Sequence, residues 1–269
     1  MSKQLTASRP VEQLKAVLNV NSVKQQFENA LAENAGPFIA SIIDLYGSDS
    51  YLQQCNPNEV VMECLKAATL KLPINKQLGF AYVVPYKVKG KPTPQFQLGY
   101  KGYIQLAMRT GQYRYLNAGV IYEGCQIERD LLTGNITITG EPTSDKAIGY
   151  FAYMELLNGF SKTAYMTKAE IEAHAKKYSS SYSHSGSAWK TNFDDMAMKT
   201  MIRQLLSKYG YLSTDMISAL TSDEETVDNR VMTEIEMEAN SEVIDLEPGD
   251  YEVAQGGEPE QATMEGPGF

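Results

Sequence analysis

The sequence predicts an α+β fold, in which helices at both ends of the chain flank a small antiparallel sheet. Apolar residues recur at helical spacing before Pro73, alternate strictly after Leu78, and return to helical spacing after Thr167. With 269 residues, 43% of them hydrophobic, the chain can bury a core of its own. No apolar run approaches the roughly 18 residues of a membrane span, and the first residues lack the apolar stretch of a secretory signal.

Three helices are expected before the sheet. Val11–Ala35 carries apolar residues at helical spacing, and a second helix runs from Pro37 to Tyr46, where Gly47 is expected to end it. The pair Asn56-Pro57 is typical of a helix start, and this third helix continues toward Pro73.

The sheet is predicted from residues that alternate with a period of two. Phe80–Tyr86 and Phe96–Tyr100 flank the turn-like sequence VKGKPT and form a β-hairpin. A short helix, Lys101–Thr110, follows it. Further strands are expected at Tyr113–Tyr122, Gln126–Asp130, Ile136–Thr139, Ala147–Leu156 and Thr163–Tyr165.

The C-terminal part returns to helices. Thr167 and Glu170 have the spacing of a capping box at the start of a helix that extends to about Lys177. A serine-rich loop, a long helix over Trp189–Tyr209 and a short one over Ser213–Leu220 follow. From Thr221 onward, acids, glycine and proline dominate, so we expect a disordered tail.

Few residues are suited to metal binding or nucleophilic catalysis. The three cysteines, Cys55, Cys64 and Cys125, show no CxxC spacing, and the two histidines lie in no recognisable triad. We therefore expect no disulfide framework and no zinc site, and a reducing cytoplasm. No GxxxxGK[ST] motif is present, so ATP-driven strand exchange is not expected.

Charge is distributed very unevenly. Residues 221–269 hold one basic and fifteen acidic side chains, a net charge of −14, whereas residues 1–220 hold 23 basic and 18 acidic, a net charge of +5. Between Glu63 and Glu123 there are nine basic residues, nine aromatic residues and no acid. A basic track with interleaved aromatics is typical of a groove for single-stranded nucleic acid, although separate solvated lysines and core aromatics are the plainer alternative.

Two of the expected helices carry a polar stripe on one face. In the helix Lys101–Thr110, the residues Lys101, Gln105 and Arg109 lie within about 80° of one another around the axis. In the helix Trp189–Tyr209, the residues Asn192, Lys199 and Arg203 lie within about 40°. The two stripes could form opposite walls of one groove, or belong to two ordinary amphipathic helices.

Three segments resemble the RecT family of single-strand annealing proteins, and most closely those of phages of Gram-positive bacteria. They are LGFAYVVPY (78–86), LGYKGYIQLAMRTGQY (98–113) and WKTNFDDMAMKTMIRQLLSKY (189–209). The resemblance covers residues 60–209; Gly210-Tyr211-Leu212 departs from it, where a proline is expected. It implies ATP-independent single-stranded DNA binding and annealing in phage recombination, without bond-making chemistry or a cofactor, and with Mg²⁺ as at most a modulator.

The same resemblance implies partners and a division of the chain. The partners are single-stranded DNA, the annealed duplex, further copies in a ring or helical filament, a 5′–3′ exonuclease, and the host single-strand-binding protein. Residues 1–55 would provide oligomer contacts, 56–220 the DNA-binding and annealing core, and 221–269 the acidic tail. The candidate DNA-binding residues are Lys76, Phe80, Tyr82, Lys87, Lys101, Tyr103, Gln105, Arg109, Trp189, Lys190, Asn192, Lys199, Arg203 and Lys208.

Other functions stay open on the residues alone. Asp194-Asp195 could hold Mg²⁺ in a nuclease, although acids in this position more often favour a helix N-terminus. A passive single-strand-binding protein or a protein-interaction scaffold would also fit part of the pattern.

Overall fold

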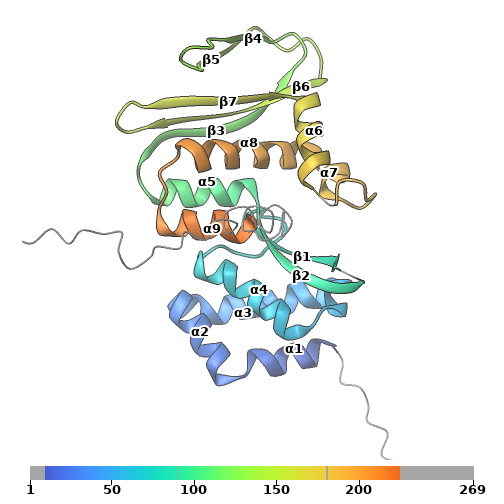
Figure 1. Ribbon diagram of the computed structural model, residues 1–269. Helices are drawn as coiled ribbons and strands as arrows, with labels where there is room; N and C mark the ends of the chain where they lie inside the picture. Colours follow the sequence, from blue (N-terminus) through green and yellow to red (C-terminus); the bar gives the residue numbers. More distant parts are fainter. Residues whose placement is uncertain (1–9, 89, 180, 225–269) are drawn as a thin grey trace, which may run out of the picture. The chain divides into compact units, whose positions relative to one another are not determined.

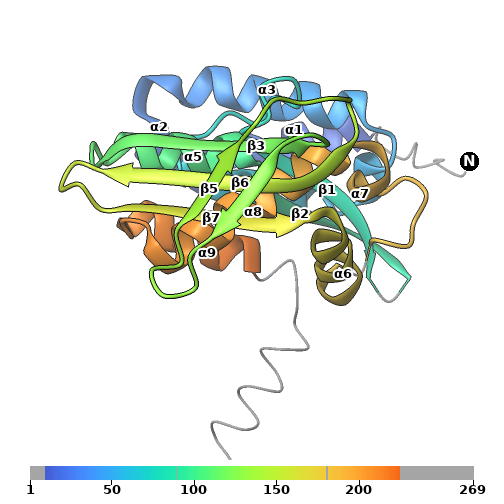
Figure 2. The same cartoon turned by 90° about the horizontal axis from the view of Figure 1, so that it is seen from above.

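The computed structural model describes residues 10–224 except 89 and 180, and it confirms the predicted α+β class. A sheet of order β3-β6-β7 packs on α8, which packs on α5, and α5 in turn contacts α9 (Figures 1 and 2). The hairpin β1–β2 lies between these layers and the N-terminal helices. The expected tail beyond residue 224 lies outside the described residues. Within the described part of the chain, no helix is both long and apolar enough to cross a membrane.

The N-terminal helices differ from the prediction at their ends. The segment expected as one helix is interrupted at Val20, whose backbone is extended (φ −65°, ψ 129°). The helix expected to end at Gly47 continues to Ser48. Asp49 then begins a turn by accepting hydrogen bonds from the N–H groups of Tyr51 and Leu52, each at 3.0 Å. The elements are α1 (Pro10–Leu18), α2 (Asn21–Leu31), η1 (Ala32–Asn34), α3 (Ala35–Ser48), η2 (Leu52–Gln54) and α4 (Pro57–Thr69).

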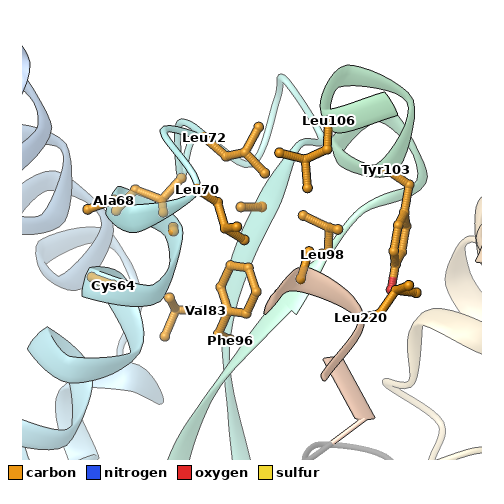
Figure 3. Packing of buried hydrophobic residues seen from close by; sticks show 14 of the residues in the cluster. Cys64, Ala68, Leu70, Leu72, Val83, Phe96, Leu98, Tyr103, Leu106 and Leu220 are labelled. Carbon is orange, nitrogen blue, oxygen red and sulfur yellow. The ribbon is translucent and has the colours of Figure 1, made fainter. Parts of the chain in front are cut away.

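The start of α4 and the presence of the β-hairpin are as predicted, but the second strand begins at Lys91, inside the expected turn, and ends at Leu98, because Tyr100 opens the next helix. The Asn56 side chain caps α4 by accepting from the N–H of Asn58 at 2.9 Å, and proline occupies the first turn. Strands β1 (Ala81–Val88) and β2 (Lys91–Leu98) pair antiparallel with Ala81 opposite Leu98. Figure 3 shows the inward face of the hairpin packed between α4 and α5. The labelled core residues there include Cys64, Leu70, Leu72, Val83, Phe96, Leu98 and Leu106.

Two glycines set the position of α5 (Tyr100–Arg109) against the start of the hairpin. A Cβ atom at Gly99 would lie 2.1 Å from the carbonyl oxygen of Gly79, and one at Gly102 would lie 2.2 Å from that of Phe80. Any larger residue must push the helix away, because these contacts are with backbone atoms. The Gly-Tyr-Lys-Gly sequence therefore brings the first turn of α5 next to β1.

The strands of the main sheet follow the predicted ranges closely. They are β3 (Tyr113–Tyr122), β6 (Ala147–Leu156) and β7 (Ser161–Thr167), and all neighbours are antiparallel. A separate hairpin, β4 (Gln126–Arg129) and β5 (Ile136–Thr139), stands beyond the sheet (Figure 1). Tyr150, Ala152 and Met154 on β6 are fully buried, so one face of the sheet covers α8.

The C-terminal helices confirm the capping box and revise the predicted long helix. Thr167 and Glu170 form the box at the start of α6 (Lys168–Tyr178). Asn192 has φ −140° and ψ 56°, which separates α7 (Ala188–Thr191) from α8 (Phe193–Tyr209). The last helix, α9 (Thr214–Glu224), extends four residues past the expected boundary at Leu220.

The exit of α8 accounts for glycine at position 210, where a proline was expected. A Cβ atom there would lie 2.6 Å from the carbonyl oxygen of Leu206 and 2.8 Å from the hydroxyl of Tyr113. That hydroxyl also accepts a hydrogen bond from the N–H of Tyr211 at 2.7 Å. Tyr113 thereby ties the start of β3 to the end of α8.

Asp223 on α9 is a buried carboxylate that joins three other elements. It is 1% exposed and accepts hydrogen bonds from the N–H of Leu98 at 3.2 Å and the hydroxyl of Tyr103 at 2.8 Å. The ammonium of Lys199 donates to it at 2.9 Å, and Nε of Arg203 lies 3.9 Å away. The folded body therefore includes α9 as far as Asp223, because this residue links β2, α5 and α8.

We predict that a chain ending at Leu220 is less stable than a chain ending at residue 229, although both lose the acidic tail. Removing one partner of a buried ion pair costs about 3–5 kcal/mol, which corresponds to roughly 6–20 °C in Tm for a chain of this size. Thermal unfolding of the two chains measures the difference. Asp223→Asn in the longer chain should reproduce most of it, and Asp215→Asn, exposed on the same helix, should not. Equal Tm values for the two chains would contradict the role given to Asp223.

Candidate nucleic-acid interface

A groove of about 280 Å³ lies between the hairpin, the start of α5 and the start of α8. Five of the residues predicted to bind DNA line it, and they come from the loop before β1, from β1, from α5, and from the α7–α8 region. They are Lys76, Tyr82, Lys101, Asn192 and Lys199. We call this the hairpin–helix groove. The first residues of the two predicted helix stripes thus share one groove.

The cations of the groove differ in how far they are already neutralised. Lys199 is paired with buried Asp223, and its side chain is only 13% exposed. Lys76 donates to Asp49 at 2.8 Å but keeps 53% of its side chain exposed. Lys101 is exposed, and its ammonium makes no ion pair with any described residue. Lys101 is therefore the groove cation best placed to meet an incoming anion.

Tyr82 supplies an aromatic ring to the same groove. It is half-buried, and burial together with the nearby carboxylate of Asp195 raises the pKa of its phenol. The ring stays neutral at physiological pH and carries no charge that would repel phosphate. The groove therefore offers both a charge contact and an aromatic face to a strand.

The acid-free stretch of sequence is not free of acidic neighbours in space. At least four of its nine basic residues pair with acids that lie outside the stretch: Lys66 with Glu63, Lys76 with Asp49, Lys91 with Glu59, and Arg114 with Glu155. The sequence pattern thus overstated the positive charge available to a ligand. This finding counts against phosphate binding by Lys66, Lys91 and Arg114, none of which lines the groove, whereas Lys76 lines it and keeps half of its side chain exposed.

Two predicted site residues have other roles in the structure, and we correct them here. Tyr103 is fully buried with its hydroxyl on Asp223, so it has no exposed face for a base (Figure 3). The guanidinium of Arg109 donates to the carbonyl oxygens of Leu70 and Lys71, at 2.7 and 2.9 Å. It closes the end of α4 and does not line the groove.

The remaining candidates lie outside the hairpin–helix groove. Phe80 is half-buried against the core, and Gln105 is half-buried on α5. Trp189 and Arg203 line a second pocket, of about 110 Å³, which adjoins the groove. Lys87, Lys190 and Lys208 are exposed on β1, α7 and α8.

Sequence reasoning missed a cluster of basic and aromatic residues on α6 and the loop after it. Lys176 and Lys190 lie over the ring of Tyr182, at 6.0 and 4.4 Å, and Lys177 lies 5.0 Å from the ring of Tyr178. The signal was present in the sequence KKYSSSYSH (176–184), which interleaves basic and aromatic residues like the acid-free stretch.

The paired acids Asp194 and Asp195 occupy the first turn of α8. Asp194 accepts a hydrogen bond from the hydroxyl of Tyr150 at 2.6 Å. Both acids also interact favourably with the positive end of the helix dipole, because they lie in the first turn. In residues 10–224, apart from 89 and 180, no group of three or more histidines, cysteines or acids is placed to hold a metal ion.

We predict that Arg109→Ala lowers stability without changing the salt dependence of DNA binding. Losing two charge-assisted hydrogen bonds to carbonyls should cost about 1–3 kcal/mol. Arg114→Ala is the matched control, because its exposed ion pair with Glu155 should contribute less than about 1 kcal/mol. Urea unfolding compares the variants. If Arg109→Ala left the stability unchanged and made the salt dependence of DNA binding shallower, the result would contradict this prediction and support the phosphate contact expected from the sequence.

Comparisons with known proteins show the family of the chain. A model of the RecT family matches residues 36–240, which is most of the chain. The chain is 47% identical over 245 residues to the uncharacterized protein YqaK of Bacillus subtilis strain 168, covering 89% of this chain and 82% of that protein. It is 32% identical over 179 residues to the protein RecT of Escherichia coli strain K12, covering 64% of this chain and 65% of that protein. Proteins of this family bind single-stranded DNA and anneal single strands in recombination. This chain belongs to the RecT family.

Proposed function

We propose that this protein binds single-stranded DNA by its phosphates along the hairpin–helix groove and anneals a complementary strand without ATP. The observation that carries the proposal is the juxtaposition of Lys76, Tyr82 and Lys101 in one groove. Three separate segments of the chain contribute these residues, and the close approach of Gly99 and Gly102 to the hairpin holds α5 in place.

The requirements of annealing favour phosphate contacts over base contacts. A strand that is to pair must present its Watson–Crick edges to the second strand, so few bases can be hidden by stacking. The groove meets this requirement, because it offers the exposed Lys101 and the partly exposed Lys76 beside only two tyrosines, Tyr82 and Tyr100. Its binding should depend little on sequence and strongly on salt.

The finer parts of the proposal rest on family membership. We propose that several copies extend the track as a ring or helical filament, with residues 1–55 providing contacts between copies. The exposed side chains of Val20 (48%) and Tyr51 (71%) in that region support this assignment. A 5′–3′ exonuclease would supply the strand and a host single-strand-binding protein would meet it, in phage recombination inside the bacterial cytoplasm.

An annealing assay tests the proposal. Complementary strands should pair faster with the protein than without it, in the absence of ATP, and both should stay intact. Mg²⁺ is expected to modulate the rate without being required. Strand degradation with Mg²⁺ would indicate a nuclease instead, and protection without faster pairing would indicate a passive binding protein.

We predict that Lys101→Ala weakens binding to every sequence alike. Loss of one phosphate contact should lower the salt slope by roughly 0.7, which corresponds to about fivefold in affinity at 0.1 M salt. Lys15→Ala is the matched control, because Lys15 lies on α1, outside the groove, and pairs with Glu12 at 3.1 Å. Fluorescence anisotropy across several salt concentrations gives both slopes. Equal slopes for the wild-type and Lys101→Ala proteins would remove Lys101 from the interface.

A further inference from the structure

A second pocket adjoins the hairpin–helix groove, and four of the residues that line it are aromatic. The two share Gln97 on β2 and Met196 and Lys199 on α8. A strand that follows the groove along α8 therefore passes the mouth of this pocket.

Aromatic rings form the walls of the pocket and are held by one another and by hydrogen bonds. His174 and Tyr178 on α6 have ring centroids 4.7 Å apart. Trp189 is 6% exposed and packs edge-on against Phe193 at 5.6 Å. The Gln97 amide donates to the hydroxyl of Tyr86 at 2.7 Å, which fixes both residues at the pocket. These contacts within the protein fix the positions of the rings.

The imidazole of His174 belongs to the aromatic wall and not to the cationic groups. Burial lowers its pKa, and the nearby charges of Arg203 and Lys177 lower it further. The ring is therefore neutral at physiological pH and presents a π-face.

The volume of the pocket, about 110 Å³, limits what it can hold. A cavity of roughly 150 Å³ lined by apolar side chains accommodates benzene. This pocket is smaller than that cavity, so it can take at most one aromatic ring, with the rest of a larger molecule outside.

Cations stand beside the pocket in positions suited to a charged backbone. Lys176, Lys177 and Lys190 are exposed and neighbour the lining residues Ala175, Tyr178 and Trp189 in the chain. None of the three makes an ion pair with a described residue. An aromatic pocket flanked by available cations has the chemistry of a nucleotide site, in which a ring is stacked and adjacent phosphates are neutralised.

We infer that the pocket of Tyr86, His174, Tyr178 and Trp189 takes a single unstacked base from the bound strand, once per subunit. This inference rests on the proposed DNA binding and adds an anchor to it. The other bases of the strand stay outside the pocket, so their edges remain available for pairing. A base held in this way would slow sliding of the strand between pairing attempts.

The single tryptophan of the chain provides the test, because its fluorescence reports on the pocket alone. The full-length protein is titrated with oligothymidylate and with an abasic strand of the same length and backbone. Oligothymidylate should change Trp189 emission and bind roughly fivefold or more tightly than the abasic strand. The abasic strand should still bind in a salt-dependent manner and leave the emission unchanged.

Two variants test the location of the effect. Gln204→Tyr places a ring at the pocket from an exposed position of α8 and should abolish the preference for oligothymidylate over the abasic strand. Tyr178→Ala removes one of the aromatic rings that line the pocket and should reduce the preference for oligothymidylate over the abasic strand. Gln26→Tyr, exposed on α2, is the matched control and should preserve it.

Several results would overturn the inference, and they differ from failure of DNA binding itself. Equal affinity and equal emission change with both strands would show that no base enters the pocket. A Gln204→Tyr protein that changes oligomeric state without DNA, yet keeps the preference, would assign the pocket to contact between copies. If neither strand bound at low salt, the proposed function itself would fail.

Discussion

The buried carboxylate of Asp223 makes the interactions on which the arrangement of the hairpin–helix groove depends. It joins α9 to the end of β2, to the middle of α5 and to α8, through Leu98, Tyr103 and Lys199. Because a buried charge is stable only when it is fully paired, these elements cannot separate one at a time without a large cost. The groove lies between the same elements, so its shape is fixed by a residue that does not line it.

The same carboxylate also determines which cations are available to a ligand. Lys199 is turned toward Asp223 and contributes to the fold, whereas Lys101, one helix away, remains exposed. Close approach of Gly99 and Gly102 to the backbone of residues 79 and 80 brings Lys101 to the groove. Lys199 and Lys101 thus line the same groove and differ in that Lys199 is paired with a buried carboxylate, whereas Lys101 is exposed.

Local patterns predicted the secondary structure well and predicted the site only in part. Strict alternation located the β1–β2 hairpin, turn residues between the later strands located β3, β5 and β6, and the capping box located the start of α6. The breaks at Val20 and Asn192 were not predicted, because apolar spacing on both sides of a single non-helical residue is compatible with a continuous helix. The end of the body was misplaced because Asp223 looks like one more acid of the tail until its distant partners are known.

The errors in the site have the same origin. Helix periodicity correctly placed Lys101 and Lys199 on polar faces, and it placed Arg109 there as well. Periodicity gives a direction about one helix axis but not the neighbour in that direction, which for Arg109 is the end of α4. In the same way, a stretch without acids says nothing about acids that fold against it, as Glu59 and Glu155 do.

An uneven charge distribution therefore has to be judged by the cations that stay unpaired after folding. The exposed lysines that make no ion pair with a described residue include Lys101 in the groove and Lys176, Lys177 and Lys190 near the second pocket. These four belong to α5, α6 and α7, and the groove and pocket near them meet at shared residues of β2 and α8. A strand bound along this path would gain phosphate contacts on both sides of the place where one base can be held.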